Sequence, residues 1–240
     1  MPDTLRYPVV LMDADETLLD FKKSEDFAIK NAMKEFRLPF KKGDKKLYSR
    51  INKETWKSLE RKEITREQLK TLRFSRFFEA LGYDFEVDCN KFHNCYVSNL
   101  SRFGFMLPGA MEFLQEICKI AEVYVVTNGL AAAQKGRMKD SGIDKVVKKV
   151  FISEEVGFQK PEKEFFDKVF EEIGLCDKSK AIILGDSLTS DMQGGKNAGI
   201  ATCLYLGDND YVDDEKNLCD FKIKDYKEFF SIVRYSRKNP

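Results

Sequence analysis

The sequence has no hydrophobic run long enough to cross a membrane. Its first apolar run, residues 9–12, is far shorter than the roughly 20 residues that a membrane-spanning helix needs. The amino terminus also lacks the basic segment followed by an apolar segment that is typical of a secretory signal. We therefore expect a cytoplasmic protein without a membrane partner.

An excess of charge of either sign is also absent. The chain has 41 Lys and Arg residues against 40 Asp and Glu residues, so no overall positive field would attract nucleic acid. At 240 residues and 42% hydrophobic content, the composition is typical of a globular protein with one large core and a smaller second domain. We expect a monomer or a homodimer with no nucleic-acid partner.

The six cysteines include no C-x-x-C pair. A chain of this size can fold without disulfides, so we interpret these cysteines as reduced thiols. Cys89, His93 and Cys95 form the tightest cluster, but they supply three ligands with no fourth nearby, which disfavours a zinc site.

Five short apolar, mostly β-branched runs predict strands that are buried on both faces. Between the later runs, helical patterns end at Gly142, Gly174 and Gly199, each followed by an apolar residue, which is a typical helix end. The alternation of strand and helix predicts an α/β fold with a doubly wound, Rossmann-like parallel sheet. The predicted strands are residues 9–12, 123–126, 147–152, 181–184 and 201–206.

One long segment, residues 21–105, interrupts this alternation. It has no strand-like run, and its apolar residues recur at helical spacing. We predict a helical cap domain over 21–105, inserted into a catalytic core formed by residues 1–20 and 106–240. The insertion follows the first strand, so the cap should lie over the carboxyl end of the sheet, where α/β proteins bind ligands. Residues 236–240 are expected to be frayed.

Two carboxylates, Asp13 and Asp15, directly follow the first predicted strand. Because they are two residues apart in an extended segment, both can face one crevice. A polar turn would produce the same D-x-D-x-T pattern, which ends at Thr17. The pattern becomes informative only when the other strand ends are considered.

Three further strand ends carry suitable side chains. Thr127 and Asn128 follow the second strand and can donate hydrogen bonds to phosphate oxygens. Lys160 comes after the third strand, before a proline that is expected to start the next helix, and would place a cation at that helix's amino terminus. Asp186 and Asp191 follow the fourth strand, at a spacing that can reach a hard cation.

Together these four positions resemble the four motifs of the haloacid dehalogenase-like (HAD) hydrolase superfamily. The motifs match Asp13 to Thr17, Thr127, Lys160, and Asp186 with Asp191. The segments DADETLLDF, VTNG and GFQKP are similar to those of the branch of pyrimidine and related nucleoside 5'-nucleotidases, which has a helical (type C1) cap. We find no departure from the family pattern at any of the four motifs.

The resemblance implies a Mg²⁺-dependent phosphatase. Asp13 would attack phosphorus to form an aspartyl phosphate, and Asp15 would act as general acid and then as general base. The Mg²⁺ would be held by Asp13, Asp186 and the backbone carbonyl of Asp15, with Asp191 acting through a water. The residues expected to bind phosphate and neutralise its charge are Thr127, Asn128 and Lys160.

Three function classes follow. The first is a phosphatase of nucleoside 5'-monophosphates, including non-standard pyrimidine nucleotides. The second is a phosphosugar phosphatase or phosphomutase, because the fold does not determine the substrate. The third, an inactive nucleotide-binding protein, is disfavoured by the complete motif set. Asp15 favours phosphorus chemistry, because the dehalogenase branch lacks this second carboxylate. In the cap, Trp56 or His93 could contact a base, although aromatic residues at helical spacing are more often core residues.

Overall fold

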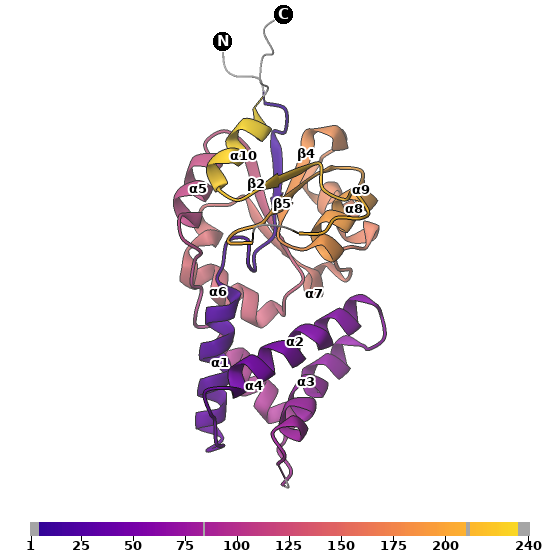
Figure 1. Cartoon of the computed structure of the whole chain (residues 1–240). Coiled ribbons are helices and arrows are strands. Elements are labelled where there is room, and N and C mark those ends of the chain that lie inside the picture. The colour runs from indigo at the N-terminus through magenta and orange to yellow at the C-terminus, as the bar shows by residue number, and fades with distance from the viewer. Residues whose placement is uncertain (1–4, 84, 210–211, 235–240) are drawn as a thin grey trace, which may run out of the picture.

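The computed structural model describes residues 5–83, 85–209 and 212–234, so the tail predicted to be frayed lies outside the described residues. The core is a six-stranded, fully parallel sheet in the order β3-β2-β1-β4-β5-β6, with helices on both faces (Figure 1). The predicted doubly wound α/β fold is confirmed.

All five predicted apolar runs form strands. A sixth strand, β6, was not predicted because it has only three residues and its central residue is the exposed Lys222. Such a segment at the sheet edge lacks the continuous apolar run of a central strand. The strands are β1 (Val9–Met12), β2 (Glu122–Thr127), β3 (Lys149–Ile152), β4 (Ala181–Gly185), β5 (Ala201–Tyr205) and β6 (Phe221–Ile223).

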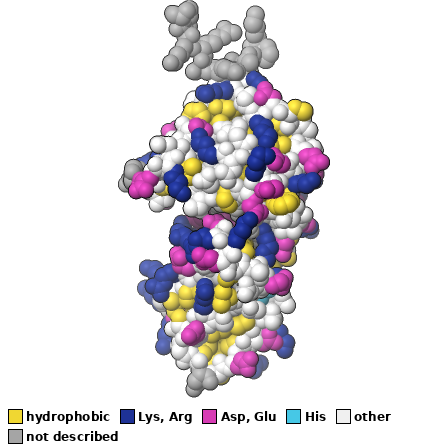
Figure 2. Space-filling model, turned by 90° about the vertical axis from the view of Figure 1, so that its right-hand side faces the viewer, with side chains coloured by type: hydrophobic (Ala, Val, Ile, Leu, Met, Phe, Trp, Pro, Cys, Tyr) yellow, Lys and Arg dark blue, Asp and Glu magenta, His cyan; other side chains and the backbone are white. Residues whose placement is uncertain are grey.

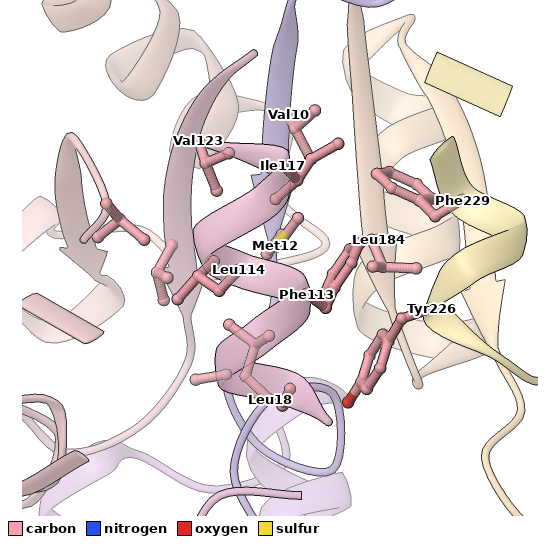
Figure 3. Close-up of a cluster of buried hydrophobic side chains, with 14 of the residues drawn as sticks. Val10, Met12, Leu18, Phe113, Leu114, Ile117, Val123, Leu184, Tyr226 and Phe229 are labelled. Carbon is pink, nitrogen blue, oxygen red and sulfur yellow. The ribbon is translucent and has the colours of Figure 1, made fainter. Parts of the chain in front are cut away.

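Alternate residues of the strands bury both faces of the sheet, because successive side chains point to opposite sides. Val10 and Met12 of β1 belong to one cluster, which Figure 3 shows packed beside Phe113, Ile117 and Tyr226. Each of these five side chains is buried. Helices on this side are α5 (Ala110–Ile117), α6 (Ala131–Ser141) and α10 (Tyr226–Val233).

On the other face, Val9 and Leu11 pack in a second cluster with Phe165 and Phe166. Gly142, Gly174 and Gly199 end α6, α8 and α9 with left-handed backbone angles, as the sequence predicts. The helices of the second face are α7 (Ser153–Val156), α8 (Lys163–Ile173) and α9 (Gln193–Ala198).

Four helices below the sheet, which we call the cap, have an aromatic core of their own (Figure 1). The rings of Tyr48, Phe74 and Tyr96 lie with centroids 5.3 to 5.7 Å apart. None of the helices in the described parts of the chain is long and apolar enough to cross a membrane. The cap helices are α1 (Phe21–Glu35), α2 (Asp44–Glu60), α3 (Arg66–Ala80) and α4 (Cys89–Leu100).

The chain enters and leaves the cap on two adjacent backbone segments. Asp20 N donates to Phe105 O at 2.8 Å, and Leu107 N donates to Leu18 O at 2.9 Å. These bonds fix the start of α1 against the segment that leads back to α5. The cap therefore follows directly from the loop after β1, at the carboxyl edge of the sheet.

Candidate active site

The carboxyl ends of neighbouring strands bring the predicted site residues to one edge of the sheet. Asp13 follows β1, Thr127 ends β2 and Asp186 follows β4, and both β2 and β4 pair with β1. A cavity of about 830 Å³ lies here, lined by these loops and by the cap. Figure 2 shows charged side chains of both signs at the junction between the core and the cap.

Lys160 lies at the centre of the site and is only 1% exposed. Its Nζ donates to Asp13 Oδ1 at 2.5 Å, to Asp191 Oδ1 at 2.6 Å and to the carbonyl of Val126 at 2.8 Å. Burial disfavours its charge, but Asp13 and Asp191 outweigh that effect and hold the pKa of Lys160 above its ordinary value. The lysine is therefore a fixed cation between two carboxylates.

The backbone of Lys160 is held by Asn128. Asn128 Oδ1 accepts from Lys160 N at 2.9 Å, and its Nδ2 donates to Lys160 O at 2.7 Å. The side chain expected to donate to phosphate thus fixes the lysine, using its oxygen and one Nδ2 hydrogen. A role for Asn128 in phosphate binding stays a prediction.

The helix after Lys160 begins later than predicted. It starts at Lys163 with Glu162 as its N-cap, not at Pro161. A turn closed by the hydrogen bond from Glu162 N to Gln159 O, at 2.7 Å, places Pro161 before the helix. The short helix α7 also separates Lys160 from the end of β3, and the lysine points to Asp13 rather than to the amino terminus of α8.

Three carboxylates converge beside the lysine. Asp13, Asp186 and Asp191 each offer an oxygen, and these oxygens all lie within 4.8 Å of one another. Burial raises the pKa of Asp13 to about 7; Lys160 opposes this, whereas Asp191 adds to it. The side chain of Asp186 is accessible to water at the surface. The protein around its carboxyl group nevertheless removes part of its hydration, and this desolvation, with the negative charge of Asp13, raises the pKa of Asp186 well above its ordinary value. Oxygen ligands at this spacing suit a hard divalent cation, which would relieve their repulsion.

Gly185 allows Asp191 to approach the strand end. A Cβ atom built on Gly185 would overlap the Asp191 carboxylate. Asp191 is fully buried, and its Oδ2 accepts a hydrogen bond from Ser187 N at 3.1 Å. Glycine at this position therefore lets the carboxylate lie directly over the end of β4.

Asp15 faces α6 rather than the cluster of three carboxylates. Arg137 Nη1 donates to its Oδ1 at 2.5 Å, and Gln134 Nε2 donates to its Oδ2 at 2.9 Å. Gln134 Nε2 also lies 2.8 Å from Thr127 Oγ1. Gln134 and Arg137 lie outside the four motifs and were not predicted, although two polar residues three apart on the helix that follows the second motif were a usable signal.

The cap contacts the core next to these loops. Thr189 donates to Glu60 of α2 at 3.1 Å. Arg66 of α3 donates to Ser153 Oγ at 2.8 Å and to Gln159 Oε1 at 2.9 Å. These contacts hold the α2–α3 end of the cap against the loops that carry Lys160 and Asp186.

The other cap residues considered as ligand contacts or zinc ligands lie in different surroundings. Trp56 lines the cavity. His93 is buried, and its Nδ1 lies 3.2 Å from Arg73 Nη2, whereas Cys95 contacts Glu35. Two of the three residues of the disfavoured zinc cluster thus contact other side chains.

Comparison with known proteins identifies the family. The model of the haloacid dehalogenase-like hydrolases matches residues 7–199. The chain belongs to this hydrolase family. The resemblance inferred from the four motifs is confirmed.

Two relatives of this HAD hydrolase are named as pyrimidine 5'-nucleotidases. PynA from Streptococcus pneumoniae is 39% identical over 83% of this chain and 84% of its own length. YjjG from Escherichia coli is 32% identical over 83% of this chain and 86% of its own length. A crystal structure of YfnB from Bacillus subtilis bound to magnesium is 32% identical and superposes with a TM-score of 0.89, covering 96% of this chain and all of that one.

Proposed function

We propose that this HAD hydrolase is a Mg²⁺-dependent phosphatase of nucleoside 5'-monophosphates, with pyrimidine nucleotides as the preferred class. The observation that carries the proposal is the buried contact of Lys160 with both Asp13 and Asp191, next to Asp186. This arrangement joins a nucleophile, a fixed cation and a set of cation ligands in one cavity. The two relatives named as pyrimidine 5'-nucleotidases support the substrate class.

In the first step, an Asp13 carboxylate oxygen attacks phosphorus and the bond from phosphorus to the leaving oxygen breaks. Asp15 transfers a proton to that oxygen. In the second step, Asp15 takes a proton from water as the water attacks the aspartyl phosphate, which releases inorganic phosphate and restores Asp13. Lys160 offsets negative charge on the phosphoryl oxygens throughout.

Asp13, Asp186 and Asp191, with the backbone carbonyl of Asp15, would hold the Mg²⁺. When bound, the ion lets the negative carboxylate and the negative phosphate approach each other. Asp13 must be ionised to attack, and Lys160 already favours that form. Gln134 and Arg137 hold Asp15 in place for both proton transfers.

Phosphate release from a panel of nucleoside 5'-monophosphates and sugar phosphates tests the proposal. Wild type and Asp13→Asn are compared in Mg²⁺ and in EDTA, with Asp144→Asn, an exposed carboxylate away from the site, as the matched control. We expect Mg²⁺-dependent release from pyrimidine nucleotides, retained in Asp144→Asn and lost in Asp13→Asn. Release from sugar phosphates alone would retain the chemistry and reject the substrate class, and turnover by Asp13→Asn would reject the covalent route.

A further inference from the structure

The cavity extends from the catalytic carboxylates into the cap, and one face of α2 lines it from Ser49 to the end of the helix at Glu60. Successive lining residues differ in number alternately by three and by one, as expected for a single helical face. Trp56 lies in this row, between two lysines. The lining residues of α2 are Ser49, Asn52, Lys53, Trp56, Lys57 and Glu60.

A buried polar array forms the cap end of the same cavity. Asn52 Nδ2 donates to Glu25 Oε1 at 2.7 Å, and Arg73 Nη1 donates to Asn52 Oδ1 at 3.1 Å. Glu25, Asn52 and Arg73 are 3%, 2% and 2% exposed, and all three line the cavity. The array spans α1, α2 and α3, so it is a shared surface of the cap rather than a local feature of one helix.

In the described part of the chain, the array includes one donor atom without a partner. Arg73 Nε is buried and finds no hydrogen-bond partner among the described residues, and leaving a buried donor unpaired is unfavourable. Glu25 is a buried carboxyl group, and that burial raises its pKa. The wall therefore has an acceptor group, Glu25, and a donor group, Arg73, on either side of Asn52, and all three line the cavity.

An adjacent acceptor and donor complement the edge of a nucleobase, where N–H donors alternate with carbonyl or ring-nitrogen acceptors. A sugar phosphate has no such edge. Trp56 supplies a flat aromatic face, on which bases stack. A volume of about 830 Å³ is within the range of small-molecule sites and has room for more than a phosphate.

We propose that Trp56 and the array of Glu25, Asn52 and Arg73 form the base-binding subsite of this phosphatase, with the ring stacked on Trp56. A uracil ring would direct its N3–H to Glu25 and a neighbouring carbonyl to Arg73. This inference rests on the proposed nucleotidase function and adds the residues that select the base.

The first test compares kcat/KM for uridine 5'-monophosphate with kcat/KM for ribose 5-phosphate, which has the sugar and the ester but no base. We expect Trp56→Leu and Glu25→Gln to lower the ratio of the two values at least tenfold, mainly through KM for the nucleotide. Trp56→Phe retains an aromatic face and should restore most of the ratio. Phe85→Leu and Glu35→Gln, exposed residues of the cap away from the cavity, are the matched controls and should change the ratio less than twofold.

The second test measures binding without turnover. Trp56 is the only tryptophan of the chain, so its fluorescence reports on this wall alone. Uridine, which has no phosphate, should change the emission in a saturable way in the wild type, and the apparent affinity should weaken at least tenfold in Glu25→Gln. Ribose should cause no saturable change.

The outcomes separate this inference from the function on which it rests. Equal losses on both phosphate esters, or no saturable response to uridine, would overturn the base-binding subsite, since a purely structural role in the cap affects both substrates alike. If the wild type releases no phosphate from nucleotides, the proposed function fails, and the uridine titration alone still supports or overturns the subsite.

Discussion

Arg137 donates a hydrogen bond to Asp15 across 2.5 Å, from a side chain that is 1% exposed. The guanidinium also lies over the ring of Phe21, with 5.3 Å between its Cζ and the ring centroid. Gln134, one helical turn earlier, bonds the second oxygen of the same carboxylate. The orientation of Asp15 is thus set by two residues of α6 that lie outside the four motifs.

Gln134→Met should therefore lower kcat by about tenfold to a hundredfold on alkyl phosphates, because Asp15 loses one of its two anchors and general acid catalysis depends on its position. The loss should be smaller on p-nitrophenyl phosphate, whose leaving group departs without a proton. The measurement is kcat for both esters. Lys139→Met, on the exposed side of α6, is the control, and an equal loss on both esters would contradict a role through Asp15.

Lys160→Met should reduce kcat by at least about a hundredfold, because it removes a preorganised cation from the phosphoryl site. It should also lower the thermal midpoint, since Asp13 and Asp191 then face each other without a counter-charge. Turnover is measured below that midpoint, where circular dichroism shows a folded protein. The exposed Lys163→Met is the control, and near wild-type turnover in Lys160→Met would exclude the assigned role.

Gly185→Ala should lower kcat at least about tenfold and raise the Mg²⁺ concentration needed for half-maximal activity. Its methyl group would occupy the position of the Asp191 carboxylate, which must then move away from Lys160 and the neighbouring ligands. Activity is measured against Mg²⁺ concentration. Gly43→Ala is the matched control, because a Cβ there meets open space and φ is −82°. A Gly185→Ala enzyme with an unchanged Mg²⁺ dependence would argue against Asp191 as part of the cation site.

His93 should make the protein less stable in acid. Burial, with the positive charges of Arg73 and Lys70, lowers the pKa of His93 from 6.5 to about 4. The unfolded chain therefore binds one more proton than the folded chain between pH 6.5 and 4, so stability is lost as the pH falls through this window and is unaffected above it.

The difference is measurable by urea unfolding at pH 7.5 and pH 5. We expect the wild type to lose about 1 to 2 kcal/mol more than His93→Gln between these two conditions. Carboxyl groups titrate equally in both proteins and cancel in the comparison. The same loss in both proteins would show that His93 does not carry the effect.

The sequence predicted the sheet and the residues brought to its edge because both depend on local patterns. Buried parallel strands are continuous apolar runs, and parallel strands place their following loops on one side. The partners of Asp15 were missed because Gln134 and Arg137 reach it from a helix more than 100 positions away along the chain. The apolar pattern of a helix does not indicate which loop that helix faces.

Asn128 and Lys160 illustrate the same limit. The sequence indicated both residues but not that the amide would bind the backbone of the lysine. The array of Glu25, Asn52 and Arg73 was also not predictable, since each residue alone is an ordinary polar position on a helix. Only the packing of α1, α2 and α3 brings the three together.

The cap is joined to the core by two backbone segments that are hydrogen-bonded to each other, at Asp20 with Phe105 and at Leu18 with Leu107. An exchange of everything between these crossing points would keep Asp13, Lys160 and the sheet in the sequence, and would replace the cap side of the contacts that Glu60 and Arg66 make with the core loops. If the proposed function holds, the molecule is modular: selection can replace the cap, proposed to recognise the leaving group, while the core, proposed to break the ester bond, is inherited. A cap transplanted from a relative at these two joints would be expected to transfer its preference together with its helices.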